Sequence, residues 1–210
     1  MSAIMQEYWD SRYVQQKEMT VGHYSFSKKK LAEVTDNSVQ IMTGIQDYFK
    51  GKKILDFGCG VGRFTDTLKV LSENGLVYGV DINQWAIDKA TKTLPEIDFR
   101  HFDGEKIPFP TGFFNVIFTW TVLQHIPNEE LEKVIIEFRR VLKNDGHIIV
   151  YENTTKKDKN AHHIWFRDIE LYSKLMTVHA YCWREHTTVC SDIDGTGEEH
   201  SLMVFGRELS

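Results

Sequence analysis

Short apolar runs alternate with amphipathic helical segments along most of the chain, and this alternation constrains the fold more than any other feature. Strands joined by helical crossovers lie parallel in one sheet, with right-handed connections and helices on both faces. The sequence therefore predicts an α/β fold. The expected strands, each brief and rich in apolar or β-branched residues, are 53–57, 77–81, 98–102, 114–119 and 147–152.

The clearest predicted helix covers residues 128–143, where apolar side chains recur at spacings of three and four and form one buried stripe. After residue 153 the pattern changes. Two strand-like runs, 182–193 and 200–207, predict a terminal antiparallel hairpin around a glycine-containing turn. Further helices are expected at 63–72, 84–93 and 167–176.

The size and charge of the chain narrow the function classes. With 210 residues and 41% hydrophobic content it is long enough for one substantial core, so a single domain is expected. A net charge of -5 gives no overall electrostatic reason to bind phosphate backbones, which disfavours a nucleic-acid partner. The three cysteines lack CxxC spacing and no apolar run suits a membrane span, so we expect a cytoplasmic protein without a membrane partner.

A glycine-rich loop follows the first expected strand. The strand runs into the sequence DFGCGVG at residues 56–62, after which helical character resumes. The three glycines permit tight turning and a close approach of the backbone to a ligand. An ordinary strand-to-helix turn could also use glycines, so this loop needs support from its surroundings.

Polar residues at the ends of the other strands supply that support, because ligands of such sheets bind beyond the carboxyl ends of the strands. Asp81 ends the second strand, where a carboxylate can accept hydrogen bonds from both ribose hydroxyls of an adenosine. Asp103 follows the third strand and could accept from the adenine amino group, with Ile82 bordering the base. Either aspartate could instead cap a turn. Thr119 and Glu152 end the fourth and fifth strands at the same edge.

In this order the segments resemble the motifs of the class I S-adenosylmethionine (SAM)-dependent methyltransferases, small-molecule branch. The resemblance covers about residues 50–155. Asn115, where the family usually has Asp, and Asn144-Asp145, in place of the common Pro-Gly, are departures at positions expected to be structural. The matching segments are ILDFGCGVG at 54–62, VDI at 80–82, DGEKIPF at 103–109, FNVIF at 114–118, VLQHI at 122–126 and RVLKNDG at 140–146.

The resemblance implies a Rossmann-like three-layer sandwich, with a mostly parallel seven-stranded sheet whose last strand is antiparallel. It also implies SAM as the cofactor. One domain would comprise an N-terminal helical lid (1–45), a SAM-binding core (50–155), and an acceptor-side helix with the terminal hairpin (156–210). The expected cofactor-binding residues are Asp56, Phe57, Gly58, Gly60, Asp81, Ile82, Asp103, Gly104, Glu105 and Thr119.

A nicotinamide dehydrogenase is the alternative that the glycine loop leaves open. Such an enzyme would favour the spacing GxGxxG and must hold a pyrophosphate at the start of the helix. Asp56 lies two residues before the first glycine. A carboxylate there suits the positively charged amino acid portion of SAM better than two phosphates, because like charges repel.

The methyl group of SAM is already electrophilic, so the protein mainly has to align a nucleophile with it and exclude water. His125 follows the fourth strand, near the place where the methyl group should point, and is the first candidate for acceptor contact or proton removal. It could equally fix the start of the next helix. Glu152 is the second catalytic candidate, although carboxylates at strand ends often have structural partners.

Two further segments are expected to contact the acceptor. YWDSRY at 8–13 resembles a lid segment of several small-molecule methyltransferases, although an aromatic helix packed on the sheet would look alike. HHIWFR at 162–167 lies where this family often shapes its acceptor pocket, and Arg167 could hold an anionic group. The adjacent histidines lack a metal-ligand pattern, so no metal is expected. The predicted acceptor-binding residues are Trp9, Tyr13, Trp120, His162, Trp165 and Arg167.

The predicted function is methyl transfer from SAM to an O or N atom of a small-molecule acceptor. A methyltransferase acting on tRNA or protein is the nearest alternative, but the acidic chain lacks an extended basic surface in its sequence. A SAM-binding regulatory protein without turnover is a second alternative. The sequence predicts no oligomeric state.

Overall fold

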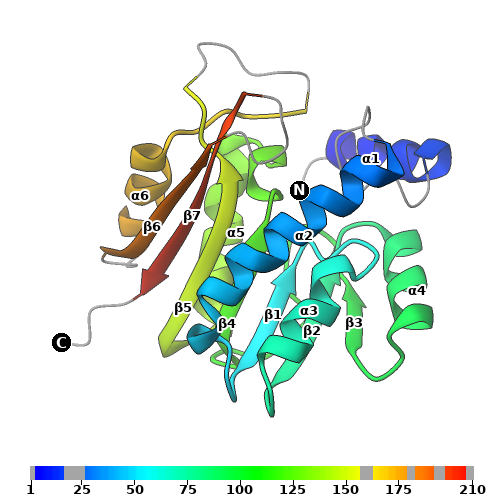
Figure 1. Ribbon diagram of the computed structural model, residues 1–210, viewed down its shortest axis with the longest axis horizontal. Helices are drawn as coiled ribbons and strands as arrows, with labels where there is room; N and C mark the ends of the chain where they lie inside the picture. The colour runs from blue at the N-terminus through cyan, green and yellow to red at the C-terminus, as the bar shows by residue number, and fades with distance from the viewer. Residues whose placement is uncertain (1–2, 17–26, 157–162, 179–182, 192–196, 207–210) are drawn as a thin grey trace.

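A computed structural model describes residues 3–16, 27–156, 163–178, 183–191 and 197–206. Its seven strands form one sheet in the order β3-β2-β1-β4-β5-β7-β6 (Figure 1). This architecture confirms the predicted α/β fold. The strands are β1 (Lys53–Phe57), β2 (Leu76–Asp81), β3 (Asp98–His101), β4 (Phe114–Trp120), β5 (Leu142–Asn153), β6 (Trp183–Ser191) and β7 (Glu199–Gly206).

Strands β1 to β5 run parallel to one another, so their carboxyl ends share one edge of the sheet. β7 pairs antiparallel with β5 and with β6, which gives the predicted terminal hairpin. The prediction of a seven-stranded sheet with an antiparallel last strand is confirmed. The chain order reverses between β1 and β4, and in open α/β sheets that is where ligands bind.

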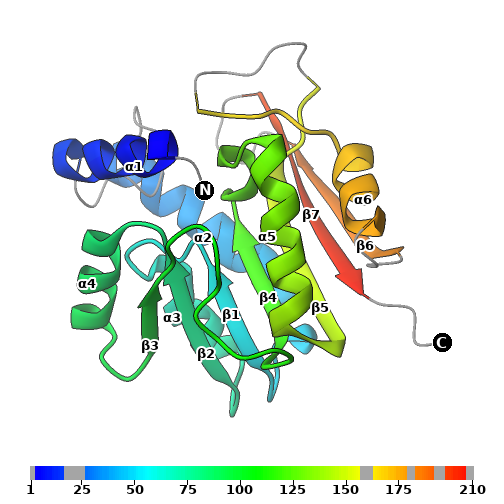
Figure 2. The ribbon, with the colours of Figure 1, turned by 180° about the vertical axis from the view of Figure 1, so that it is seen from behind.

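Helices cover both faces of the sheet. α2 and α3 lie on one face, α5 and α6 lie on the other, and α4 flanks β3 (Figures 1 and 2). α1 lies at the end toward which the parallel strands point. Within the described ranges, no helix is long and apolar enough to cross a membrane. The helices are α1 (Ala3–Gln16), α2 (Lys28–Gly44), α3 (Arg63–Leu71), α4 (Gln84–Thr93), α5 (Asn128–Val141) and α6 (Ile169–Val178), with short 3-10 turns η2 (Gln46–Tyr48) and η3 (Leu123–His125).

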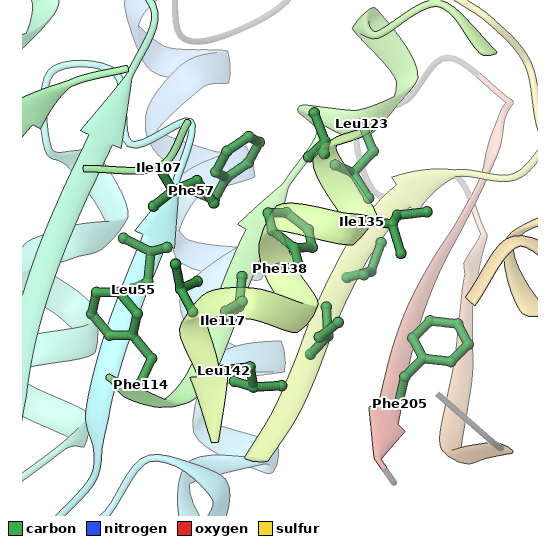
Figure 3. Close-up of a cluster of buried hydrophobic side chains, with 14 of the residues drawn as sticks. Leu55, Phe57, Ile107, Phe114, Ile117, Leu123, Ile135, Phe138, Leu142 and Phe205 are labelled. Atoms are coloured by element: carbon green, nitrogen blue, oxygen red, sulfur yellow. The ribbon is translucent and has the colours of Figure 1, made fainter. Parts of the chain in front are cut away.

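The central strands are buried on both faces, and their side chains alternate between two apolar clusters. Leu55 and Ile117 face the cluster under α5 and α6, where Phe138 packs (Figure 3). Ile54 and Phe118, their neighbours in sequence, face the cluster under α2 and α3. Because β1 and β4 are packed on both sides, the side chains and loops at their carboxyl ends have a rigid support.

Several predicted boundaries are wrong. α5 ends at Val141, two residues early, and β5 begins at Leu142 instead of residue 147. β5 pairs with β4 in two registers, and the residues between them form an irregularity. α6 begins two residues later than predicted, because Asp168 accepts a hydrogen bond from the backbone N–H of Leu171 (2.9 Å) and so caps the helix at Ile169.

Candidate active site

The glycine loop has the backbone conformation that only glycine adopts easily. Gly58, Gly60 and Gly62 have φ values of 77°, 55° and 88°. A Cβ atom on Gly58 would lie 2.5 Å from a methyl carbon of Val122. The N–H of Gly58 donates to the carbonyl of Val80 (2.8 Å), which fastens the loop to the end of β2.

Asp81 lies between this loop and the start of α4. Its Oδ2 accepts the N–H of Gly60 (2.8 Å), and its Oδ1 accepts the N–H of Asn83 (2.8 Å). Burial raises the pKa of Asp81 above its usual range, while these N–H groups oppose the rise. A carboxylate has about four lone-pair positions, so capacity remains for further donors such as ribose hydroxyls.

Asp56 has a structural partner. It is 3% exposed, and its Oδ2 accepts the hydroxyl of Thr65 at 2.6 Å, which ties β1 to α3. Burial raises its pKa to about 7; the bond from Thr65 opposes this rise, and the charge of Asp81 adds to it. The predicted direct contact with a charged ligand therefore has little accessible surface to support it.

On the predicted adenine side, Asp103 caps a turn. Its Oδ1 accepts the N–H groups of Glu105 (2.8 Å) and Lys106 (3.1 Å), and these bonds lower its pKa. Gly104 occupies this turn with a φ of 89°. Ile82 is buried, 8% exposed, directly after β2. Asp103 therefore caps a turn, as the alternative interpretation expected. Both hydrogen bonds are accepted by Oδ1, and Oδ2 takes no part in them.

Phe57 and Thr119 lie deep at the ends of β1 and β4. Phe57 is 2% exposed and packs edge-on against Phe102 and Phe138, with ring centroids 5.4 and 4.8 Å apart. Thr119 is fully buried, and its hydroxyl has no hydrogen-bond partner among the described residues. Any contribution of Phe57 to a ligand site comes through its backbone or its packing.

The chain leaves β4 through Thr121, whose φ of 53° is rare for a β-branched residue. Its N–H donates to the carbonyl of Tyr151 (2.7 Å), and its hydroxyl donates to the carbonyl of Trp120 (2.8 Å). This turn directs the chain into η3, which carries His125. No sequence signal points to Thr121, because threonine has no preference for this conformation.

Glu152 caps η3 from below. Its Oε1 accepts the N–H groups of Val122 (2.9 Å) and Leu123 (2.7 Å), and its Oε2 accepts the N–H of Gln124 (3.2 Å). Burial raises the pKa of this fully buried carboxyl to about 7, against these donors. Its geometry gives the predicted catalytic residue a structural partner, the loop after β4.

Arg167 is 1% exposed, and its donors face the protein interior. Its Nη1 donates to the carbonyl of Leu123 (2.9 Å), its Nη2 to the carbonyl of Ile126 (2.5 Å), and its Nε to Oδ1 of Asn128 (2.9 Å). The structure does not support the expectation that Arg167 holds an anionic acceptor group, because the guanidinium is buried and donates to these three protein oxygens.

His125 is held by both ring nitrogens. Nδ1 lies 2.7 Å from the carbonyl oxygen of His163, and Nε2 lies 3.3 Å from the amide nitrogen of Gln124. A carbonyl oxygen can only accept, so Nδ1 carries the proton and Nε2 accepts from Gln124. Burial lowers the pKa of His125 to about 3, and the imidazole is therefore neutral at physiological pH.

Aromatic rings of α1 cover this histidine. The ring of Trp9 lies edge-on to His125, 5.0 Å between centroids, and the ring of Tyr8 stacks on His163 at 4.7 Å. The expected lid segment and the residues after β4 and β5 are therefore in contact. Tyr8 was not among the predicted acceptor-binding residues.

The same helix also reaches the opposite side of the edge. Oδ1 of Asp10 accepts the side-chain amide of Asn83 at 2.6 Å, and Asn83 donates its backbone N–H to Asp81. α1 thus spans from the start of α4 to the segment after β5 (Figures 1 and 2).

The other predicted acceptor-binding residues have different environments in the structure. Trp120 is a core residue: it is 7% exposed and stacks on Tyr151 with centroids 3.8 Å apart, so the predicted acceptor contact is replaced by packing. Trp165 is half-buried, and its backbone N–H donates to the backbone carbonyl of Gln124 (2.8 Å), the residue before His125. His162 and the side chain of Tyr13 lie outside the described residues.

Comparison with known proteins adds to this geometry. Residues 54–146 match the family described as "Methyltransferase domain". The chain is 28% identical over 159 residues to demethylmenaquinone methyltransferase from Lactobacillus johnsonii, covering 67% of this chain and 64% of the relative. It is 34% identical over 109 residues to sterol 24-C-methyltransferase from Gibberella zeae, covering 49% and 28%. The chain thus spans less than two thirds of the length of these relatives.

The fold resembles that of solved structures over nearly its whole length. Magnesium protoporphyrin IX methyltransferase from Synechocystis PCC 6803 with bound SAH superposes with a TM-score of 0.73, covering 98% of this chain and 99% of that one. The sequences are 17% identical, so this likeness concerns the fold alone.

Proposed function

We propose that the protein is a class I, SAM-dependent enzyme that transfers a methyl group from SAM to a small-molecule acceptor, because residues 54–146 match the methyltransferase domain family. The observation that carries the proposal is Asp81, held at the carboxyl edge by the N–H of Gly60 with lone pairs to spare. The glycine loop and the proposed ribose-binding carboxylate thereby form one unit. A ribose at this unit would direct the methionine portion toward the loop and the base toward Ile82.

The proposed acceptor side is formed by α1, the loop after β4 and the segment after β5. Trp9, His125 and Trp165 come from these three parts of the chain. With its pKa near 3, the imidazole of His125 is a poor match for proton removal at neutral pH. We assign it the other predicted role, which is contact with and orientation of the acceptor. Orientation is the main requirement for attack on a methyl group that is already activated.

The class of acceptor follows from charge and similarity. The net charge of -5 supports a small molecule over tRNA. Transfer to O or N remains our first proposal. Carbon is the second candidate, because a sterol 24-C-methyltransferase is among the similar proteins.

Calorimetry with SAM and a transfer assay separate the competing functions. We expect saturable binding of SAM and transfer of labelled methyl from SAM to a low-molecular-weight fraction of a cell extract. Binding without transfer to any fraction would favour a regulatory SAM-binding protein. Label in the tRNA or protein fraction would favour the macromolecular alternative, and failure to bind SAM would remove the proposal.

A further inference from the structure

We propose that Glu152 and Arg167 form a buried clamp on η3 and are positioning residues that fix the orientation and the tautomer of His125. The inference rests on the proposed function, because it concerns the histidine assigned to the acceptor. It differs from the roles expected from the sequence, in which the carboxylate was a catalytic group and the guanidinium bound the acceptor.

The clamp holds both ends of a three-residue helix. Such a short helix leaves most of its backbone N–H and carbonyl groups without internal partners. Glu152 accepts the N–H groups at its start, and Arg167 donates to the carbonyl of Leu123, the first residue of η3, and to that of Ile126, which follows its last residue. The negative charge lies at the positive end of the helix and the positive charge at the negative end, which is the favourable arrangement.

Two buried charges are more than a short turn needs for its stability. Removal of an ionised carboxylate and a guanidinium from water carries a large desolvation cost, even when the two attract. Tyr172 is buried beside them: burial and the charge of Glu152 raise its pKa, and Arg167 opposes the rise. Buried polar networks of this kind can specify one arrangement where apolar packing would tolerate several.

The clamp also joins η3 to the segment that precedes α6. Arg167 lies at the end of this segment, and His163, whose carbonyl accepts from Nδ1 of His125, lies at its start. The backbone of Trp165 between them donates to η3 as well. The two stretches are therefore fastened to each other. Four hydrogen bonds join them, His125 to His163, Trp165 to Gln124, Arg167 to Leu123 and Arg167 to Ile126.

The consequence for His125 is a single tautomer. While the carbonyl of His163 stays in place, Nδ1 keeps the proton and Nε2 stays an acceptor. If the clamp loosens, the segment that carries His163 can shift. Water can then reach the imidazole of His125, and its second tautomer becomes populated. A residue that served only global stability would not select between tautomers.

Histidine side-chain NMR on the full-length protein, labelled with nitrogen-15 histidine, tests the clamp. His125→Gln assigns the signal. We expect one tautomer protonated at Nδ1 in the unchanged protein. In Arg167→Lys we expect both tautomers and a titration midpoint of His125 moved up toward that of an exposed histidine.

Arg140→Lys is the matched control. Arg140 also donates to two carbonyls, those of Phe109 (2.8 Å) and Ile107 (2.7 Å), and pairs with a glutamate, Glu137. Its substitution should lower the melting temperature without changing the His125 signal. If both lysine variants leave the tautomer and midpoint of His125 unchanged, the clamp has no positioning role.

A milder pair covers the case in which Arg167→Lys does not fold. Asn128→Ala removes the acceptor of Nε, and Asn128→Asp keeps it. The alanine variant should show the second tautomer, and the aspartate variant should restore the single one. Equal spectra for the two variants would overturn the proposal. Calorimetry with SAM on the unchanged protein tests the proposed function separately, because the NMR readout needs no cofactor.

Discussion

Three buried or half-buried carboxylates lie at the strand ends, and their partners decide what each can do. Glu152 accepts three backbone N–H groups, and Asp56 accepts a hydroxyl from α3. Asp81 accepts two N–H groups at the edge of the sheet and keeps capacity for more. All three are carboxylates at or next to the carboxyl end of a strand, so local sequence alone could not separate their roles.

Substitution of Asp81 should act on cofactor binding. Asp81→Ala is expected to weaken SAM binding by roughly tenfold or more, because each hydrogen bond to a charged group contributes about 1.5–3 kcal/mol. Asp98→Ala is the control, since Asp98 lies at the opposite end of β3 and pairs with Arg100. Isothermal calorimetry of both variants measures the difference. An unchanged affinity in Asp81→Ala would remove its ribose role.

The pKa of Asp56 gives a prediction for stability against pH. Burial raises this pKa from 3.8 to about 7, so the folded protein binds the proton more tightly than the unfolded chain. The stabilisation is therefore complete below pH 4 and is lost as the pH rises through about 7. Between these two pH values, the free energy of unfolding of Asp56→Asn should therefore rise relative to that of the unchanged protein.

Denaturant unfolding at pH 4.5, 6 and 8 measures this gain. The lowered pKa of His125 acts in the opposite sense, but it is common to both proteins and cancels in the difference. Parallel pH profiles for the two proteins would mean that Asp56 titrates normally.

At the scale of elements, the glycine loop is a turn whose shape is set by sterics. Gly58→Ala should lower the free energy of unfolding by more than the about 1–2 kcal/mol that a left-handed backbone alone costs, because the new methyl group meets Val122. Gly112→Ala is matched, since its φ is 64° and its Cβ would meet open space. Equal destabilisation in urea would show that the contact with Val122 is harmless.

α1 is held near its middle by two kinds of contact, a hydrogen bond at Asp10 and aromatic contacts at Tyr8 and Trp9. Asp10→Ala should raise amide hydrogen exchange in α1, because local opening follows the loss of tertiary contacts. Ser11→Ala is the control: Ser11 bonds only to the carbonyl of Tyr8 among the contacts described. Equal exchange in the two variants would contradict this attachment.

Elements with local patterns could be predicted, and contacts between distant segments could not. Strands β1 to β4 and α4 were predicted to within one residue at each end, because hydrophobic periodicity depends on neighbours in sequence. The loop at 56–62 and Asp81 were singled out by spacing. The inward-facing Arg167, the cap by Glu152 and the buried place of Trp120 depend on which segments meet, and no local pattern encodes that.

On the scale of the whole molecule, a packed scaffold can be distinguished from the parts that are proposed to contact the acceptor. Two apolar clusters, one of them drawn in Figure 3, hold β1, β2, β4 and β5 between helical layers. The proposed cofactor residues lie at one edge of that support. α1 and the segment after β5 come from outside the region 54–146 that matches the methyltransferase family. The acceptor is therefore expected to depend on these two additions.

A crystal structure of the protein with S-adenosylhomocysteine tests the account most directly. We predict the adenosine across the carboxyl edge of β1 and β2, with both ribose hydroxyls within hydrogen-bonding distance of Asp81 and the amino acid portion beside Gly58 and Gly60. A ligand bound elsewhere, or one whose ribose makes no contact with Asp81, would contradict it.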